Sequence, residues 1–272
     1  MKITNNILRT LKNIPAGIAA LLISANLSLS CASINGHLSY THRDTSKLPY
    51  DAFAYVMITQ KATAEECVEA VDREGCESLI KFLPPIVIEG SGSGLLMWAG
   101  RAPVIVTAAH VCTSTSFPEF HIQEGMKIRV KSETIITYRT HTGEVAQAEV
   151  VALNPINDLC ALSVERVYAA PVRIARSSPS IGDAVYVISA PYGINAPTMS
   201  LIFSGFYSGR DSSTHFYTLP TRPGSSGSVI LNSNFRAVGV TSAAFSDIES
   251  IGMGPGQEEL SSFLDDIKKR SE

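Results

Sequence analysis

Residues 222–230 read Arg222-Pro-Gly-Ser-Ser-Gly-Ser-Val-Ile230, which places serines in a glycine-rich turn directly before an apolar strand. Pro223 restricts the backbone that enters the turn, and Gly224 can adopt angles that point its N–H inward. A serine hydroxyl is a weak nucleophile at neutral pH, so it needs a histidine to accept its proton and a carboxylate to orient that histidine. It also needs N–H donors where negative charge develops. The turn around Ser226 is therefore a candidate nucleophile site.

Two other segments offer the missing groups. Val106-Thr-Ala-Ala-His110-Val places a histidine where an apolar strand ends in small residues. Asn157-Asp158-Leu-Cys-Ala-Leu162 places a carboxylate where a loop enters an apolar strand, a setting suited to orienting an imidazole. We therefore expect His110 and Asp158 to lie beside Ser226.

From residue 85 onward, short runs rich in Val, Ile, Tyr and Thr alternate with Gly, Pro, Ser and Asn. About a dozen short strands with few helices between them favour an antiparallel sandwich or barrel over βαβ units. The predicted strands are Ile86–Glu89, Gly94–Trp98, Val104–Thr107, Lys127–Lys131, Ile135–Arg139, Val145–Leu153, Leu159–Val164, Asp183–Ser189, Ser200–Tyr207, His215–Leu219, Ser228–Leu231 and Arg236–Thr241. The tail predicts an amphipathic helix over about 257–269 that caps a barrel.

The N-terminal residues 1–32 have the layout of an export signal. Three basic residues precede an apolar stretch of sixteen residues, Ile14 to Leu29, and small residues follow it. Sixteen residues are short for a membrane span, which needs about twenty. Two processing routes stay open, a cut after Ala32 or a lipid on Cys31. We expect export to the periplasm, the cell envelope or the medium, with membrane contact only through this signal or lipid.

Residues 33–84 are predicted to be an N-terminal extension that is partly helical. Residues 33–60 are weakly patterned and we interpret them as a mobile lead-in. A capping box, Thr63 with Glu66, and apolar residues at helical offsets predict a helix over the stretch from Thr63 to Asp72. Pro84-Pro85 ends whatever helix precedes it, so the main domain is expected over 85–272.

Charge and cysteine usage exclude several classes of function. The 22 Lys+Arg against 25 Asp+Glu give a net charge of −3 without a basic run, so nucleic acid is not expected as a partner. If Cys31 is removed or lipidated, Cys67, Cys76, Cys112 and Cys160 allow three disulfide pairings. A local Cys67–Cys76 bridge is feasible, and Cys112 and Cys160 either pair or fill the core. No metal-ligand spacing accompanies them, so no metal or cofactor is expected.

Three segments together resemble the chymotrypsin-like (trypsin-fold) serine proteases, closest to the Deg-type and glutamyl-endopeptidase-like bacterial branches. In chain order they are Thr107-Ala-Ala-His110, Asp158-Leu-Cys-Ala-Leu162 and Gly224-Ser-Ser-Gly-Ser228. His110 and Asp158 lie 48 residues apart, and Asp158 and Ser226 lie 68 apart. The resemblance covers about residues 85–269. It implies two antiparallel six-stranded β-barrels, over about 85–168 and 169–250.

The resemblance also implies functional roles. His110 would be the general base and then acid, Asp158 the orienting group and Ser226 the nucleophile, and the N–H groups of Gly224 and Ser226 would form the oxyanion hole. The expected activity is serine endopeptidase action on polypeptides. The alternatives are a catalytically silent envelope protein that binds peptides or a partner, and a hydrolase of esters.

Two departures from the digestive members of the family refine this expectation. Ser225 stands where those enzymes carry the Asp that pairs with a newly cut N-terminus, and no Ile-Val-Gly-Gly start occurs near residue 86, so no activating cut is expected. Pro220 stands where trypsin has its specificity Asp. The resemblance places the substrate pocket at Pro220, Val240, Thr241, Ser242 and Ala243. Because Ala replaces Gly in this wall, the sequence predicts small or medium aliphatic P1 residues.

Overall fold

A computed structural model describes residues 44–113, 119–123, 126–245 and 248–271. The chain divides into two compact units, Met1–Ser46 and Lys47–Glu272, and both sheets and the candidate site belong to the second. The predicted export signal (1–32), with its two processing routes, and most of the predicted lead-in lie outside the described residues. Within the described part, no helix is long and apolar enough to cross a bilayer.

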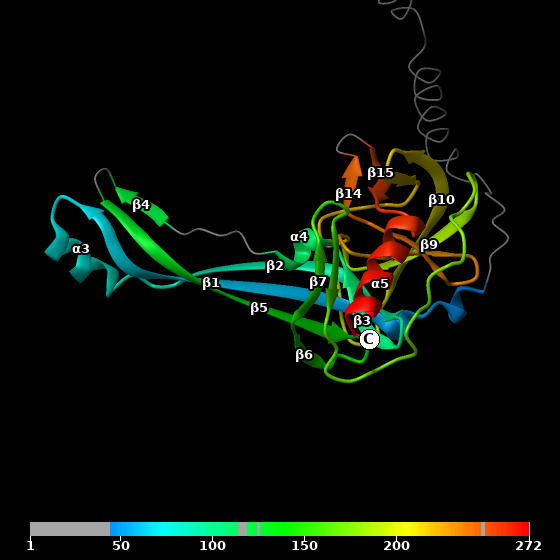
Figure 1. Ribbon diagram of the computed structural model, residues 1–272, viewed down its shortest axis with the longest axis horizontal. Coiled ribbons are helices and arrows are strands. Elements are labelled where there is room, and N and C mark those ends of the chain that lie inside the picture. The colour runs from blue at the N-terminus through cyan, green and yellow to red at the C-terminus, as the bar shows by residue number, and fades with distance from the viewer. Residues whose placement is uncertain (1–43, 114–118, 124–125, 246–247, 272) are drawn as a thin grey trace, which may run out of the picture. The chain divides into compact units, whose positions relative to one another are not determined.

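The first sheet contains eight described strands in the order β4-β5-β1-β2-β3-β8-β7, with β6 paired to β5 (Figure 1). All these pairings are antiparallel. The strands are β1 (Phe53–Ala70), β2 (Ile86–Ala99), β3 (Ala102–Thr107), β4 (Glu119–Gln123), β5 (Met126–Thr140), β6 (Val145–Ala148), β7 (Val150–Asn154) and β8 (Leu159–Leu162).

The second sheet contains seven described strands in the order β13-β12-β9-β10-β11-β15-β14, again antiparallel. They are β9 (Ala184–Ser189), β10 (Leu201–Asp211), β11 (Thr214–Tyr217), β12 (Val229–Asn232), β13 (Ala237–Val240), β14 (Ala243–Phe245) and β15 (Ile248–Gly254). The helices are α3 (Arg73–Ile80), α4 (Ala109–Cys112) and α5 (Gln257–Ser271), with short 3-10 turns η2 (Thr45–Lys47), η3 (Tyr50–Ala52) and η4 (Pro191–Gly193).

The prediction of an all-β fold with a C-terminal helix is confirmed. The two sheets, however, contain eight and seven strands where six-stranded barrels were expected, and within the described residues neither hydrogen-bonded ladder closes on itself. The sequence pattern predicted none of β1, β4, β14 and β15. In addition, β2 and β5 each join two predicted strands, and one predicted strand is divided into β6 and β7.

The predicted helix from Thr63 to Asp72 is wrong, because this stretch lies mostly in β1. Local helix signals are weak, and long-range pairing overrides them. Here Glu66 pairs with Arg129 of β5 in the strand register and as an ion pair, and Cys67 pairs with Ile128. The helical part of the extension is α3, whose N-cap Asp72 accepts a hydrogen bond from the N–H of Gly75 at 3.0 Å.

The expected boundary at residue 85 does not coincide with a break in the sheet. Strand β1 begins at Phe53 and pairs with β2 from Phe53↔Leu95 to Ala62↔Ile86. Residues 53–84 therefore belong to the first sheet and its elaboration. The described residues from Phe53 to 60, part of the predicted mobile lead-in, form a paired strand.

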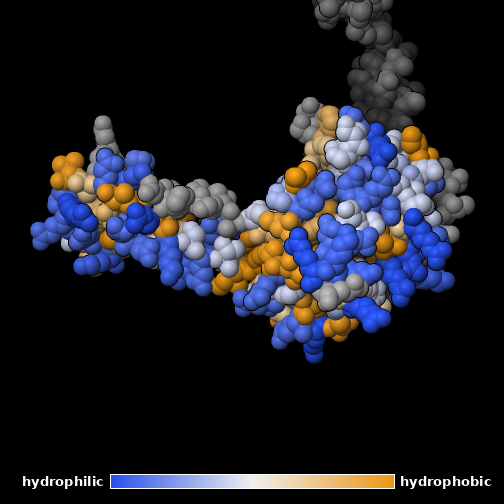
Figure 2. Space-filling model, in the orientation of Figure 1, coloured by the Kyte–Doolittle hydropathy of each residue, from blue (hydrophilic) through white to orange (hydrophobic). Residues whose placement is uncertain are grey.

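The distal parts of β1, β2 and β5 continue away from the rest of the first sheet, together with α3 and β4 (Figure 1). We call this segment the arm (residues 60–90, 119–123 and 126–135). A small cluster, buried Cys67, Cys76 and Ile128, lies inside it, and the Cys67–Cys76 disulfide joins β1 to α3. Apolar side chains at its end remain exposed, Val71 at 97% and Phe82 at 85%, and Figure 2 shows hydrophobic atoms there.

One core cluster packs side chains of both sheets against α5, and a second cluster, which includes Val187, Tyr217 and Ile230, lies within the second sheet. The helix buries Leu260, Phe263, Leu264 and Ile267, which form the apolar face of the predicted amphipathic helix. Segment 172–175 connects the sheets, because Val172 bridges to Met97 of β2 and Ile174 bridges to Ala237 of β13. This packing fixes β3 and β8 of the first sheet relative to β12 of the second, and the candidate site is built on those strands.

Candidate active site

The turn that carries Ser226 has a backbone that only glycine adopts readily at two positions. Gly224 has φ +89° and Gly227 has φ +85°. A Cβ on Gly227 would lie 2.0 Å from Oγ1 of Thr107 and 2.2 Å from the carbonyl oxygen of Ser93. The turn is therefore seated directly against the end of β3, three residues before His110.

His110 and Asp158 are joined by two hydrogen bonds. The backbone N–H of His110 donates to Oδ1 of Asp158 at 2.9 Å, and Nδ1 of the imidazole lies 2.8 Å from Oδ2. The N–H of Ala109 donates to the carbonyl of Asp158 at 3.1 Å. Asp158 has φ +51°, a left-handed conformation that a short acidic side chain tolerates. A carboxylate bound at Nδ1 leaves Nε2 as the ring nitrogen for other chemistry.

A disulfide holds these two segments together. Cys112 follows His110 by two residues and Cys160 follows Asp158 by two, and the two cysteines are bonded over a sequence separation of 48. Together with Cys67–Cys76, this resolves the pairings that the sequence left open. The bridge ties α4 to β8, so the imidazole and its carboxylate partner are linked covalently as well as by hydrogen bonds.

The charge state of Asp158 suits an orienting role. Burial raises the pKa of this carboxyl, but the hydrogen bonds from the side chain and the backbone N–H of His110 outweigh that effect, so its pKa lies below the ordinary value. An ionised Asp158 accepts the Nδ1 hydrogen and favours the imidazole tautomer with an open Nε2.

Two backbone N–H groups of the turn have no acceptor among the described residues, those of Gly224 and Ser226. The carbonyl of Pro223 accepts a hydrogen bond from the N–H of Tyr192 at 2.6 Å. Because a trans peptide points its C=O and the following N–H in opposite directions, the N–H of Gly224 is turned away from Tyr192. Unpaired donors of this kind can stabilise an oxyanion.

Ser93 is a site residue that sequence reasoning missed. It is fully buried on β2, and its N–H donates to the carbonyl of Ser226 at 2.8 Å. Its hydroxyl donates to the carbonyl of Gly224 at 2.9 Å and accepts from the N–H of Ala190 at 3.0 Å. Its carbonyl accepts from the hydroxyl of Thr107 at 2.8 Å. The surrounding sequence, Gly92-Ser93-Gly94, carries no signal that would assign a role to the serine between the two glycines.

The described structure contains no hydrogen bond between the hydroxyl of Ser226 and His110. Hydrogen bonds of this kind are often long in unliganded enzymes and tighten when substrate binds. Ser226 is half-buried and the side chain of His110 is 48% exposed, so a substrate has access to both.

The residues predicted to form a substrate pocket separate into three groups. Ser242 and Ala243 line a cavity of about 210 Å³ together with Asp158 and Met253. Val240 and Thr241 are buried, and Pro220 is exposed. No group of His, Cys, Asp and Glu among the described residues is arranged to hold a metal ion.

Comparison with known proteins adds a family to this geometry. Residues 92–240 match the family of the trypsin-like peptidase domain. No curated protein matches the chain. Among solved structures, the HtrA-type protease AlgW with a decapeptide is similar, with 19% sequence identity and a TM-score of 0.58. The match covers 84% of this chain and 66% of that one, so this chain spans just under two thirds of its length.

The family match extends over more than half of the chain and includes the segments of His110, Asp158 and Ser226. The structural match shares the fold of two antiparallel sheets with a C-terminal helix. The chain belongs to the trypsin-like peptidase family.

Proposed function

We propose that this chain is an exported endopeptidase that hydrolyses peptide bonds through an acyl-enzyme on Ser226, with His110 and Asp158 completing a catalytic triad. The observation that carries the proposal is the 2.8 Å contact between the imidazole of His110 and Asp158, beside a serine turn seated on Thr107. The N–H groups of Gly224 and Ser226, which have no acceptor among the described residues, support an oxyanion hole at the same turn.

In the proposed reaction, the hydroxyl of Ser226 attacks the substrate carbonyl while Nε2 of His110 takes its proton. Negative charge develops on the carbonyl oxygen, and the N–H groups of Gly224 and Ser226 stabilise it, by roughly 2.7–4 kcal/mol per donor in comparable sites. His110 then gives the proton to the leaving amine. Water then attacks the acyl carbon while His110 accepts its proton, and His110 returns that proton to the oxygen of Ser226 as the acyl bond breaks. Asp158 stabilises the imidazolium throughout.

The substrate of this proposal is a polypeptide with a small or medium aliphatic P1 residue. The similar HtrA-type structure contains a decapeptide, which supports a polypeptide ligand for this chain. Ala243 lies exposed on the wall segment next to Asp158, where its methyl group narrows the space available to a P1 side chain. We assign the pocket to the segment 240–243 together with Pro220.

We also propose that activity needs no activating cut near residues 85–90. Ser225, in the place of the digestive enzymes' Asp, is buried, and its hydroxyl accepts a hydrogen bond from the N–H of Arg222 at 3.3 Å. Its own N–H donates to the carbonyl of Arg222 at 2.8 Å. The turn is thus stabilised within itself and does not depend on a new N-terminus.

Export rests on the sequence of residues 1–32, which directs the chain to the periplasm, the cell envelope or the medium. Two disulfides, Cys67–Cys76 and Cys112–Cys160, support an oxidising compartment.

Digestion of an unfolded protein such as reduced casein tests the proposed activity. We expect Ser226→Ala to lower the rate by several orders of magnitude, because triad members act as a unit. Ser233→Ala, which removes a hydroxyl from the turn between β12 and β13, should leave it unchanged. A Ser226→Ala protein that digests casein at the parental rate would refute the proposal. Parental protein that binds casein without cutting it would instead favour the silent peptide-binding alternative, and cleavage of esters alone would favour the esterase.

A further inference from the structure

Four arginine side chains gather at two adjoining cavities. The first cavity, of about 530 Å³, is lined by Arg173, Arg176 and Arg236 among others, and the second, of about 390 Å³, by Arg101 and Arg173 with Trp98. Arg173 lines both cavities, so they form one continuous surface, which we call the arginine groove (Arg101, Arg173, Arg176 and Arg236). None of the described residues that line either cavity is acidic.

The backbone holds two of these arginines side by side. Ile174 and Ala237 form a parallel bridge, and the N–H of Ala237 donates to the carbonyl of Arg173 at 3.1 Å. Arg173 directly precedes Ile174 and Arg236 directly precedes Ala237. Because the bridge is parallel, the two arginines are neighbours across it. Like charges opposite each other on paired strands are unfavourable. The packing of segment 172–175 on β13 nevertheless places them there.

Within the described residues, no carboxylate forms an ion pair with any of the four arginines. Other surface arginines of this chain do have such partners, for example Arg166 with Glu144 and Arg210 with Glu258. The chain as a whole carries a net charge of −3. A concentration of positive charge without a carboxylate partner among the described residues, on a mildly acidic protein, fits an anionic ligand.

The neighbouring groups fit a phosphate oxyanion. Guanidinium groups bind phosphate through two parallel N–H donors, which a simple point charge cannot do. Oδ1 of Asn232 accepts hydrogen bonds from the N–H groups of Asn234 and Arg236, at 2.9 and 3.0 Å. The amide nitrogen of Asn232 is therefore available to donate into the cavity that it lines. A volume of about 530 Å³ is in the usual range for small-ligand sites.

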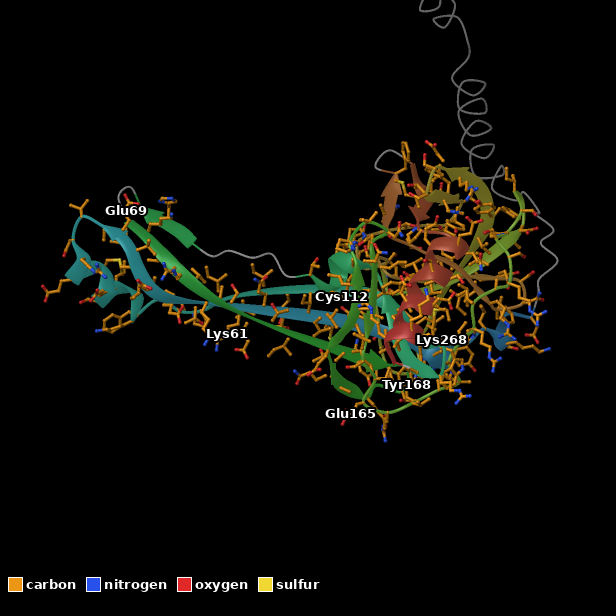
Figure 3. All side chains as sticks on the ribbon, in the orientation of Figure 1. Lys61, Glu69, Cys112, Glu165, Tyr168 and Lys268 are labelled. Carbon is orange, nitrogen blue, oxygen red and sulfur yellow. A yellow bond between two sulfur atoms is a disulfide. The ribbon has the colours of Figure 1, made fainter. Side chains whose placement is uncertain are left out.

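We propose that the arginine groove binds a phosphate group, with Arg173 and Arg236 as its principal ligands and Asn232 as a further donor. The phosphate belongs either to a free small molecule or to the headgroup of an anionic phospholipid. The second cavity extends the site past Trp98 to Arg101, next to the turn where Gly100 packs on the side-chain stem of Lys268 of α5, labelled in Figure 3.

This site is separate from the candidate active site. Strand β12 leads from the Ser226 turn to Asn232, and its four extended residues alone, Val229 to Asn232, span about 10 Å. None of the four arginines contacts the triad through a described hydrogen bond or ion pair. Binding at the groove is therefore expected independently of catalysis, and its test does not depend on the proposed activity.

Titration calorimetry with inorganic phosphate, at constant ionic strength with chloride as the reference anion, tests the proposal. We expect saturable phosphate binding by the parental protein that chloride does not reproduce. Arg173→Gln with Arg236→Gln should weaken the binding by about tenfold or more, because each substitution removes charge-assisted hydrogen bonds. The matched control, Lys61→Gln with Lys131→Gln, removes two charges from the arm and should bind phosphate as the parent does. Figure 3 labels Lys61 there.

A lysine double variant and vesicles complete the design. Arg173→Lys with Arg236→Lys keeps the charge but loses the planar fork, so its affinity should lie between those of the parent and the Gln variant. Sedimentation with phosphatidylglycerol vesicles, against phosphatidylcholine vesicles, separates the two sources. Groove-dependent binding to phosphatidylglycerol that free phosphate displaces assigns the headgroup, and phosphate binding without vesicle binding assigns a small molecule. The proposal is overturned if phosphate does not bind saturably, or if the Gln variant and the arm control bind it equally.

Discussion

The disulfide Cys112–Cys160 is expected to stabilise the protein more than Cys67–Cys76 does, because it closes a longer loop and so removes more entropy from the unfolded chain. The two bridges close loops with sequence separations of 48 and nine residues. In the chain-entropy description, the longer loop contributes about 4.1 kcal/mol at 25 °C and the shorter about 2.6 kcal/mol, a difference of about 1.5 kcal/mol. All four cysteines are buried, so the packing that their removal disturbs is similar in both cases.

Two double variants test this expectation. The first carries Cys112→Ala and Cys160→Ala, and the second carries Cys67→Ala and Cys76→Ala. Urea unfolding gives the midpoint and slope for each. The first double variant should lose more stability. It should also lose peptidase activity while still folded, because its bridge aligns the segments of His110 and Asp158. The second changes only the arm and should retain parental kcat/KM.

Equal losses of stability in the two double variants, with unchanged slopes, would refute the loop-length reasoning. A folded Cys112→Ala, Cys160→Ala protein with parental activity would show that the hydrogen bonds between His110 and Asp158 align these residues without the bridge.

Three further predictions concern single residues. Gly227→Ala should lower the free energy of unfolding by about 3 kcal/mol, because the new methyl group would collide with Thr107 of β3. Gly182→Ala, also at positive φ but with open space around it, should lower it by about 1 kcal/mol. Equal losses would argue against the close contact between Gly227 and β3. Asp158→Asn should lower kcat by about 10⁴-fold. It should also remove a stabilisation that the parental protein has above the unfolded pKa of Asp158 and loses as the pH falls through the lower folded pKa. Unfolding free energies of both proteins across acidic pH check this, and an equal dependence on pH in the two proteins would contradict it. Ser93→Ala should lower kcat by a factor at least ten times larger than any change in KM, because it removes the hydrogen bond to the Gly224 carbonyl and leaves the buried N–H of Ala190 without its acceptor. The control Ser132→Ala, on the arm, should change neither kcat nor KM.

Much of the fold was readable from the sequence because β-branched runs bounded by turn residues recur along residues 85–241. The exceptions have physical causes. Strand β1 contains a capping box, and it becomes a strand through its pairing with β2 and with the distant, fifteen-residue β5, which alone pairs with the capping-box residues. Strand β14 has three exposed residues and β15 contains two glycines, so neither has an apolar alternation to detect.

The candidate site was predictable in its parts but not in its connections. The segments of His110, Asp158 and Ser226 each carry a local signal, because the chemistry demands particular residue types beside turns and strand ends. The role of Ser93 depends on hydrogen bonds to Gly224 and Ala190, which are about a hundred or more residues away in the chain. The disulfide pairing likewise requires that β8 and α4 be adjacent in space.

The most direct test of the proposed catalytic centre is covalent labelling by a fluorophosphonate, with the modified residue located by mass spectrometry. The reagent reacts only with a serine whose hydroxyl is activated by a base beside an oxyanion hole. We expect one label, on Ser226, in the parental protein and in Ser233→Ala. His110→Ala should abolish it while leaving the fold intact. A label on another serine, or undiminished labelling of Ser226 in folded His110→Ala, would contradict the assignment of these residues.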